Sequence, residues 1–382
     1  MIEATAMCQN KDIMRKPIKR IVIKVGSSTV ADASGRLDRE NMKQLVEQVA
    51  QVWRQGTACV IVTSGAIAAG VEQLELKKRP REIAKLQAAA AVGQGLLIHE
   101  YTRLFHEHGI QAAQILLTQF DMAHRELYLN ARHALDQLLA MRVVPIVNEN
   151  DTTTVEEIKF GDNDMLAALV AVLIDADHLA LLSDIDGLYA ADPRKAEKVE
   201  KISLVNEITP EIEQMAEGIG SAFGSGGMIT KINAAKLVGA ARISMQIADG
   251  REPGVLQKMI AGEEVGTYFA PGKRKIPGRK LWLGFSRAVK GRVIIDPGAV
   301  KAIRDDGRSL LPAGVVGCDG DFTIGDTIEI SDDVGQVIAR GISNYSAAEL
   351  AGIQGKRTAQ ISKESAGDFS EEVIHRDHMV LL

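Results

Sequence analysis

One stretch of the chain, Gly224 to Lys231, carries residues that could hold a phosphate group. It reads Gly-Ser-Gly-Gly-Met-Ile-Thr-Lys and precedes Ile232–Leu237, which we expect to open a helix. Glycines let backbone N–H groups converge on one point, and a helix N-terminus adds partial positive charge there. Lys231 supplies a full charge. The spacing differs from a P-loop, which ends in Gly-Lys-Ser/Thr, so a flexible surface loop ahead of a helix is the alternative.

A second lysine, Lys24, lies near the end of a short β-branched run, Lys19–Val25. An unpaired ammonium group is costly to bury. Lys24 must therefore reach either solvent at the edge of the sheet or an anion. The turn Gly26-Ser27-Ser28 follows directly, and this position favours the anion.

The densest polar cluster follows the apolar run Val143–Val147. It comprises Asn148–Asp151, three threonines and Gly161–Asp164, and it precedes an apolar helical stretch, Met165–Ile174. Carboxylate and amide groups at the end of a strand can bind a substrate ammonium group or Mg²⁺, and they can orient lysines. Asn and Asp are also favoured at helix N-caps. Helix capping explains some of these residues. It does not explain why the segment between the strand and the helix carries two separate polar groups, Asn148–Asp151 and Gly161–Asp164.

Two further predicted strands end in turns of small or acidic residues. The run Ala58–Thr63 leads into Ser64-Gly65-Ala66-Ile67-Ala68-Ala69-Gly70, and His178–Leu182 leads into Ser183 and Asp184. Small residues after a parallel strand leave room for a ligand at the carboxyl edge of a sheet. They also permit close packing of the following helix, and both interpretations can hold together.

The elements that must position these residues alternate along the chain. The remaining strands are predicted at Ala112–Leu117, Ile243–Ala248 and Val265–Ala270. Helices are predicted at Arg39–Gln55, Ile83–Phe105, Ala131–Met141, Met165–Ile174 and Pro253–Ala261. This alternation is typical of an α/β fold with a largely parallel sheet.

The composition changes after residue 270. Residues 271–280 hold two Pro-Gly pairs and five basic residues without an acid, which is typical of a linker; a nucleic-acid patch is the alternative. Strands at Gly291–Asp296, Thr327–Ile330 and Gly335–Ile342, with a helix at Ala299–Asp305, then predict a small β domain. We therefore expect an N-terminal extension (1–17), an α/β domain (18–270), a linker (271–285), a β-rich domain (286–368) and a C-terminal tail (369–382).

The composition of the 382 residues excludes several classes of protein. Contents of 46% hydrophobic and 25% charged residues are ordinary for a soluble globular protein. A net charge of −5 and 4% aromatic residues argue against an extended nucleic-acid surface. Three cysteines without metal-binding spacing indicate free thiols in a reducing compartment. No apolar run is long enough for a membrane span, and the first seventeen residues lack a signal-peptide core. We expect a cytoplasmic protein.

Taken in order, the motifs resemble the amino acid kinase family, in the form that carries a C-terminal PUA domain. The runs that carry the resemblance are Ile23–Ser28, Val62–Gly70, Val147–Asp151, Gly161–Asp164, Gly187–Tyr189 with Ala191–Pro193, and Gly226–Met228 with Thr230–Lys231. They extend over residues 18 to about 270, and the β domain continues the match, including Gly307–Pro312. Any one run is weakly specific, whereas the ordered set is strongly so.

The resemblance implies an open, mostly parallel eight-stranded sheet sandwiched by helices, followed by a small β-rich PUA domain. It also implies ATP-dependent phosphorylation of the γ-carboxylate of L-glutamate, which gives an acyl phosphate in the first step of proline biosynthesis. ATP would be the co-substrate and Mg²⁺ the cofactor, with no metal ligand assigned among the protein side chains.

The resemblance also suggests roles for individual residues. Lys24 and Lys231 match the lysines that bracket the transferring phosphoryl group, and Asp164 matches the residue that holds both. The residues matching the substrate site are Ser64, Gly65, Asn148, Asp151 and Asn163. The residues matching the nucleotide site are Lys24, Gly26, Ser183, Asp184, Ser225, Gly226, Gly227, Met228, Ile229, Thr230 and Lys231.

Partners and regulation follow from the same resemblance. It implies inhibition by proline near the glutamate site, a homodimer or homotetramer, and functional coupling to glutamate-5-semialdehyde dehydrogenase. The segment Asp121–Asn130 matches a region associated with assembly and feedback. The alternatives are a related kinase acting on N-acetylglutamate or aspartate, and an RNA-binding protein with a PUA domain. Asp151 and Asn163 favour a free α-ammonium group, and the negative net charge argues against RNA as the main partner.

Overall fold

The protein is described by a computed structural model. The structure describes residues 16–32, 35–118, 121–122, 124–153, 163–191, 199–217, 227–273, 289–356, 360 and 370–381. The chain divides into two compact units, residues 1–275 and 276–382. In the described residues, no helix combines the length and apolar character needed to cross a membrane.

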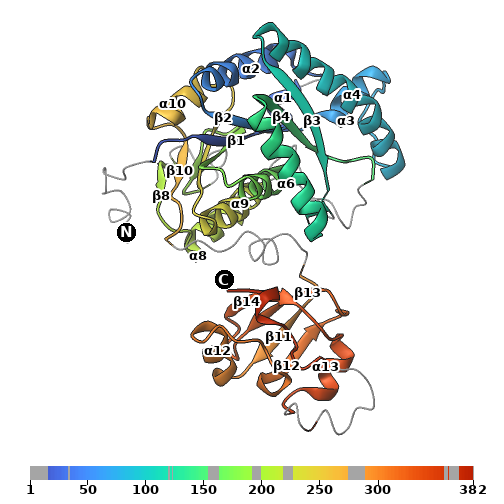
Figure 1. Ribbon diagram of the computed structural model, residues 1–382, viewed down its shortest axis with the longest axis vertical. Helices are drawn as coiled ribbons and strands as arrows, with labels where there is room; N and C mark the ends of the chain where they lie inside the picture. The colour runs from blue at the N-terminus through green and yellow to red at the C-terminus, as the bar shows by residue number, and fades with distance from the viewer. Residues whose placement is uncertain are drawn as a thin grey trace. The chain divides into compact units, whose positions relative to one another are not determined.

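The first unit is built on a mostly parallel sheet of eight strands (Figure 1). In spatial order these are β3 (Gln111–Leu117), β4 (Val143–Glu149), β2 (Ala58–Val62), β1 (Arg20–Val25), β5 (His178–Ser183), β9 (Ser244–Asp249), β10 (Thr267–Phe269) and β8 (Leu204–Val205). Neighbouring strands are parallel except for β9 and β10, which are antiparallel. The predicted α/β fold is therefore confirmed. The sequence did not reveal β8, because two residues carry no periodic signal.

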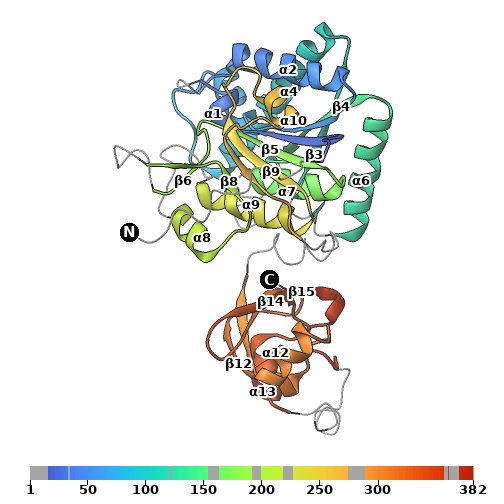
Figure 2. The same cartoon turned by 90° about the vertical axis from the view of Figure 1, so that its left-hand side faces the viewer.

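Helices cover both faces of this sheet (Figures 1 and 2). One face carries α2 (Arg39–Arg54), α4 (Ile83–Glu107) and α10 (Val255–Ala261), and the other carries α6 (Arg125–Ala140), α7 (Asn163–Leu173) and α9 (Met228–Ala240). The central strands β1 and β5 are buried along nearly their whole length, as expected for parallel strands covered on both faces. This layering explains the continuous apolar runs in the sequence.

Two predicted helix starts differ from the observed ones by a full turn or more. Helix α6 begins at Arg125 rather than Ala131, and its early residues lie largely at the surface, where no apolar period marks them. Helix α9 begins at Met228 rather than Ile232, after Gly227 in extended backbone as its N-cap. Consequently Thr230 and Lys231 lie in the first turn of a helix and not in the loop before it.

Short elements connect the layers. They are α1 (Ser27–Val30), α3 (Ala66–Gln73), α8 (Pro210–Glu217) and a two-stranded sheet of β6 (Leu188–Tyr189) and β7 (Lys201–Ile202). Helix α3 packs against α4 so closely that a Cβ on Gly70 would lie 1.8 Å from the Ala89 carbonyl oxygen. A Cβ on Gly93 would lie 1.8 Å from the carbonyl oxygen of Ala66. The small residues after β2 therefore allow close packing of α3 against α4, which was one of the two interpretations of this stretch of sequence.

The second unit has a five-stranded sheet with its own core. Its spatial order is β12 (Val315–Gly320), β11 (Gly291–Ile295), β13 (Thr327–Ser331), β14 (Val337–Ile342) and β15 (Met379–Leu381). The helices α12 (Pro297–Arg304) and α13 (Ala347–Ile353) accompany it. Strand β15 pairs with β14, although the sequence predicted a tail over these residues. Val373 and Ile374 also belong to the core.

Candidate functional site

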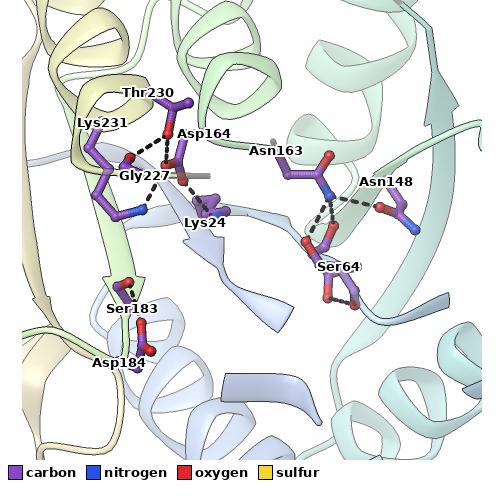
Figure 3. A network of polar contacts seen from close by, with 11 residues as sticks. Lys24, Ser64, Asn148, Asn163, Asp164, Ser183, Asp184, Gly227, Thr230 and Lys231 are labelled. Atoms are coloured by element: carbon purple, nitrogen blue, oxygen red, sulfur yellow. Dashed lines mark hydrogen bonds and ion pairs between the residues drawn. The ribbon is translucent and has the colours of Figure 1, made fainter. Parts of the chain in front are cut away.

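The candidate site lies at the carboxyl edge of the first sheet. Strands β4, β2, β1, β5 and β9 run parallel, so their C-terminal ends meet at this edge, where ligands bind in open α/β sheets. Figure 3 shows two groups of polar side chains there, one around Asp164 and one around Asn163. These two residues are neighbours at the start of α7.

Asp164 joins the two predicted catalytic lysines. Its Oδ1 lies 2.6 Å from Lys24 Nζ, and its Oδ2 lies 2.8 Å from Lys231 Nζ (Figure 3). Thr230 Oγ1 also lies 3.1 Å from Oδ2. The sequence allowed helix capping for Asp164, but the structure directs this carboxylate to side chains of β1 and α9 instead. Lys24 therefore meets an anion rather than solvent.

This ion cluster is buried. Lys24 is 3% exposed, Lys231 is 4% exposed and Asp164 is 0% exposed. Two ammonium groups share one carboxylate, which leaves a formal charge of one positive unit among the three. Charges interact more strongly in a low-dielectric interior than in water. Two buried lysines at the end of a parallel sheet can attract and hold an anionic group such as a phosphate.

The elements fix this geometry in different ways. Lys24 lies in the central strand β1, between β2 and β5. Asp164 and Lys231 lie in the first turns of α7 and α9, whose N-terminal ends carry partial positive charge. Thr230 anchors its own turn, because its backbone N–H and its hydroxyl both donate to the Gly227 carbonyl oxygen, over 3.2 and 2.8 Å.

Other residues predicted to contact the nucleotide lie along the same edge. Gly26 donates its backbone N–H to the Leu182 carbonyl oxygen over 3.2 Å, and a Cβ there would lie 3.7 Å from Lys24 Nζ. The glycine thus leaves open the space beside the ammonium group. Ser183 ends β5, and its hydroxyl donates to Asp184 Oδ1 over 3.1 Å. Met228 is buried at the start of α9 and Ile229 is half-buried, whereas Ser225 and Gly226 lie outside the described residues.

Asn163 organises the second group. Its Nδ2 lies 2.6 Å from the Thr63 carbonyl oxygen, 2.9 Å from Ser64 Oγ and 3.1 Å from Asn148 Oδ1, so its two hydrogens serve three acceptors. The structure thereby brings together three residues predicted to bind substrate: Ser64, Asn148 and Asn163 (Figure 3). No described residue donates a hydrogen bond to Asn163 Oδ1, and that oxygen is suited to accept one from a ligand.

Gly65 and Asp151 complete the predicted substrate residues. Gly65 has φ +104°, in the left-handed region, and a Cβ there would lie 3.0 Å from Val30 Cγ1. The left-handed backbone and the nearby Val30 side chain therefore account for glycine at this position. Asp151 follows β4, which pairs with β2, so it leaves the sheet at the same edge as Ser64. Gly161 and Asp162 lie outside the described residues, and so does the glycine-rich run before Gly227.

Sequence reasoning missed three residues that support this edge: Thr63, Gln94 and Tyr101. The Asn148 amide donates to Gln94 Oε1 over 2.9 Å. Thr63 Oγ1 donates to the Ser64 carbonyl oxygen and lies 2.9 Å from the Tyr101 hydroxyl. Burial raises the pKa of Tyr101 to about 12, and the hydrogen bond with Thr63 opposes that rise. Gln94 and Tyr101 are seven positions apart in α4, so they lie on one face of the helix. The local sequence does not indicate which residues they contact.

The segment predicted to serve assembly and feedback begins with a local turn. Asp121 Oδ2 accepts hydrogen bonds of 2.7 Å from the backbone N–H and the hydroxyl of Thr118. The rest of the segment is largely the start of α6. No hydrogen bond or ion pair among the described residues joins Asp121 to the Asp164 or Asn163 groups.

The described residues contain no group of three or more His, Cys, Asp or Glu side chains arranged to hold a metal ion. The chain's own described side chains therefore do not form a dedicated metal cage. Mg²⁺ commonly keeps several waters and binds through substrate phosphates.

Each of the two units matches a known protein family. Residues 19–249 match the amino acid kinase family, and residues 291–364 match the PUA domain. Solved structures similar to this chain include the UMP kinase from Bacillus anthracis. It is 15% identical in sequence, has a TM-score of 0.47, and the match covers 67% of this chain and 97% of that chain.

Relatives of nearly the same length match almost the whole chain. The glutamate 5-kinase of Moorella thermoacetica is 47% identical over 95% of this chain and 96% of its own length. The glutamate 5-kinase of Thermoanaerobacter sp. is 47% identical over 95% of this chain and 98% of its own. That of Burkholderia mallei is 48% identical over 95% and 98%. The chain therefore belongs to the glutamate 5-kinases, a phosphotransferase group of the amino acid kinase family with a C-terminal PUA domain.

Proposed function

We propose that the protein transfers the γ-phosphoryl group of ATP to the γ-carboxylate of L-glutamate, giving L-glutamyl 5-phosphate. The observation that carries this proposal is the pairing of two buried lysines on Asp164 beside the amide-lined group around Asn163. Relatives that share nearly half of the residues are named for this activity. A cytoplasmic enzyme at the first step of proline biosynthesis is the corresponding cellular role.

The chemistry requires charge neutralisation more than proton transfer. The attacking carboxylate is already an anion, so no general base is needed, and the transfer depends on positioning and electrostatic stabilisation. Lys24 and Lys231 would oppose the repulsion between the carboxylate and the triphosphate, and Asp164 would keep both ammonium groups oriented. Mg²⁺ bound to ATP would supply further charge neutralisation.

The polar group beyond Asp164 suits the amino-acid end of the substrate. Asp151 and Asn163 offer oxygen acceptors for an α-ammonium group, and Ser64 offers a hydroxyl donor for a carboxylate. Gly65 and Asn148 would shape the same site. This set favours free glutamate over N-acetylglutamate, whose nitrogen carries no charge.

The activity can be tested with ATP, Mg²⁺ and hydroxylamine, which traps an acyl phosphate as a hydroxamate. We expect hydroxamate with L-glutamate and little with aspartate or N-acetylglutamate. The opposite preference would contradict the assignment. The same assay with added proline tests feedback inhibition.

Regulation and assembly belong to the same proposal. We expect proline to compete with glutamate, and we expect a homodimer or homotetramer. An acyl phosphate is reactive toward water, which favours coupling to the dehydrogenase that consumes it. RNA binding by the PUA domain would appear as a salt-sensitive shift of labelled tRNA.

A further inference from the structure

Helix α4 contributes a polar side chain to the candidate site, although this helix is not part of the carboxyl edge of the sheet. Gln94 is half-buried on α4, and its Oε1 accepts a hydrogen bond of 2.9 Å from Asn148 Nδ2. Asn148 is 2% exposed and Asn163 is 8% exposed. The three amides form a chain that runs from the helix to the residues around Ser64.

The direction of this chain is fixed at one end by the backbone. The Thr63 carbonyl oxygen can only accept, so the Asn163 group that faces it at 2.6 Å must be the amino group. That amino group also faces Asn148 across 3.1 Å, so Asn148 presents its oxygen there. Asn148 must then turn its own amino group toward Gln94, which has to present an oxygen.

Gln94 therefore stabilises one of two orientations of the Asn148 amide. A partner that could not accept would leave a buried N–H of Asn148 unsatisfied, and a flip of Asn148 would set two amino groups against each other at Asn163. The Thr63 carbonyl oxygen sets the orientation of Asn163, and the oxygen that Asn148 presents supports it. This orientation turns Nδ2 toward Thr63, Ser64 and Asn148 and leaves Oδ1 as an acceptor for a ligand.

Helix packing holds Gln94 at the correct distance. Gly93, the preceding residue, touches the backbone of α3 so closely that any side chain would clash. Tyr101, on the same face of α4, contacts Thr63 at 2.9 Å. The helix backbone is thus held on both sides of Gln94, and the side chain lies within reach of Asn148.

We propose that Gln94 is a positioning residue for the glutamate site, where it orients Asn148 and, through Asn148, supports the orientation of Asn163 in which the site recognises the α-ammonium group of the substrate. This inference rests on the proposed function. It assigns Gln94 a role in specificity without contact to the reacting atoms. Loss of its acceptor should weaken recognition of the ammonium group and leave recognition of the carboxylates and of ATP intact.

The test compares two replacements of Gln94 that have similar length. Gln94→Glu keeps an oxygen acceptor, whereas Gln94→Met removes it. A control on the same helix is Thr102→Val, because Thr102 is exposed and its hydroxyl donates to the Ile98 carbonyl oxygen of its own helix. Each protein is assayed by hydroxamate formation for the KM of L-glutamate and of ATP. The Ki of glutarate, which resembles glutamate without its α-amino group, is measured in parallel.

We expect Gln94→Met to raise the KM of L-glutamate about tenfold, as the loss of one buried hydrogen bond predicts. The KM of ATP, the Ki of glutarate and the melting temperature should stay near wild-type values. Gln94→Glu and Thr102→Val should resemble the wild type. An unchanged KM of L-glutamate in Gln94→Met would overturn the proposal, as would an equal rise for glutamate and glutarate or an equal loss in Gln94→Glu. Absence of wild-type turnover would instead refute the proposed function, so the two failures are distinct.

Discussion

Lys24 Nζ lies 2.6 Å from Asp164 Oδ1, inside a cluster in which neither residue is more than 3% exposed. Lys231 occupies the other oxygen of the same carboxylate. A single acidic residue thus sets the separation of two lysines that come from different elements of the sheet and helix layers. The first two predictions follow from this shared carboxylate.

Replacement of Asp164 by Asn should affect both folding and catalysis. The change leaves two buried ammonium groups without their counter-ion, and breaking a buried ion pair typically costs about 3 kcal/mol or more. We expect a comparable loss in the free energy of unfolding, measured by chemical denaturation, and a large fall in kcat. Asp136→Asn is the matched control, because Asp136 pairs with Arg20 at the surface and should cost less than about 1 kcal/mol.

Replacement of Lys231 by Met should lower kcat at least about 100-fold, since it removes one group that stabilises charge in the transition state. Circular dichroism should show an unchanged fold. Lys236→Met is the control on the same helix, because Lys236 pairs with Glu213 away from Asp164. Full activity in Lys231→Met would remove this residue from the mechanism.

Tyr101→Phe tests the support of β2 by α4. The hydroxyl groups of Tyr101 and Thr63 lie 2.9 Å apart and form a buried hydrogen bond, and its loss should cost about 1 kcal/mol at neutral pH. Burial raises the pKa of Tyr101 from 10.0 to about 12. The native state therefore favours the protonated phenol, and this stabilisation is complete below pH 10 and is lost as pH rises toward about 12. The difference in the free energy of unfolding between the wild type and Tyr101→Phe, measured by chemical denaturation, should become smaller over that pH range. A difference in the free energy of unfolding that does not change with pH would contradict this explanation.

Replacement of two glycines of α4 by alanine should change the stability of the protein in opposite directions. A Cβ on Gly93 would lie 1.8 Å from the Ala66 carbonyl oxygen and 2.3 Å from the Gly70 nitrogen. Gly93→Ala must displace backbone, so we expect a loss of stability of about 1–3 kcal/mol or more and a weaker affinity for glutamate through Gln94. Nothing lies within 4 Å of a Cβ on Gly95. Gly95→Ala should therefore raise stability by about 0.5–1 kcal/mol through helix propensity. Equal effects at the two positions would refute the proposed helix contact.

The second unit carries an acid-sensitive ion pair network on its sheet. Glu329 lies 2.8 Å from Arg340 and 3.0 Å from Arg292. Burial alone would raise the pKa of Glu329, but hydrogen bonds and charges from the two arginines outweigh it and hold the pKa below 4.5. A lowered pKa stabilises the fold above pH 4.5, and that contribution is lost as pH falls through the folded value. We expect Glu329→Gln to speed hydrogen exchange in β13 at pH 7, with the difference vanishing in acid. A difference that persists in acid would exclude this charge effect.

Much of this protein could be predicted from local patterns. Apolar runs such as Ile21–Val25 and Leu179–Leu182 predicted buried parallel strands, since both faces of each strand are covered by helices. Lys24 stood out because it interrupts such a run. Lys231 stood out because it follows a glycine cluster, even though its helix begins earlier than the apolar pattern indicated.

Other features depend on contacts between elements far apart in the sequence, and the tertiary structure alone decided them. The family resemblance implied that Asp164 holds both lysines, but no local pattern distinguishes this pairing from capping of α7, because the choice depends on where β1 and α9 meet its first turn. Nor does the alanine-rich sequence around Gln94 indicate a partner at the end of β4. The sequence by itself determined the layers and the residues able to do chemistry, since these follow from local periodicity and residue type. The tertiary structure decided which carboxylate, amide and ammonium groups share a site, since hydrogen bonds and ion pairs depend on the distance between side chains in space.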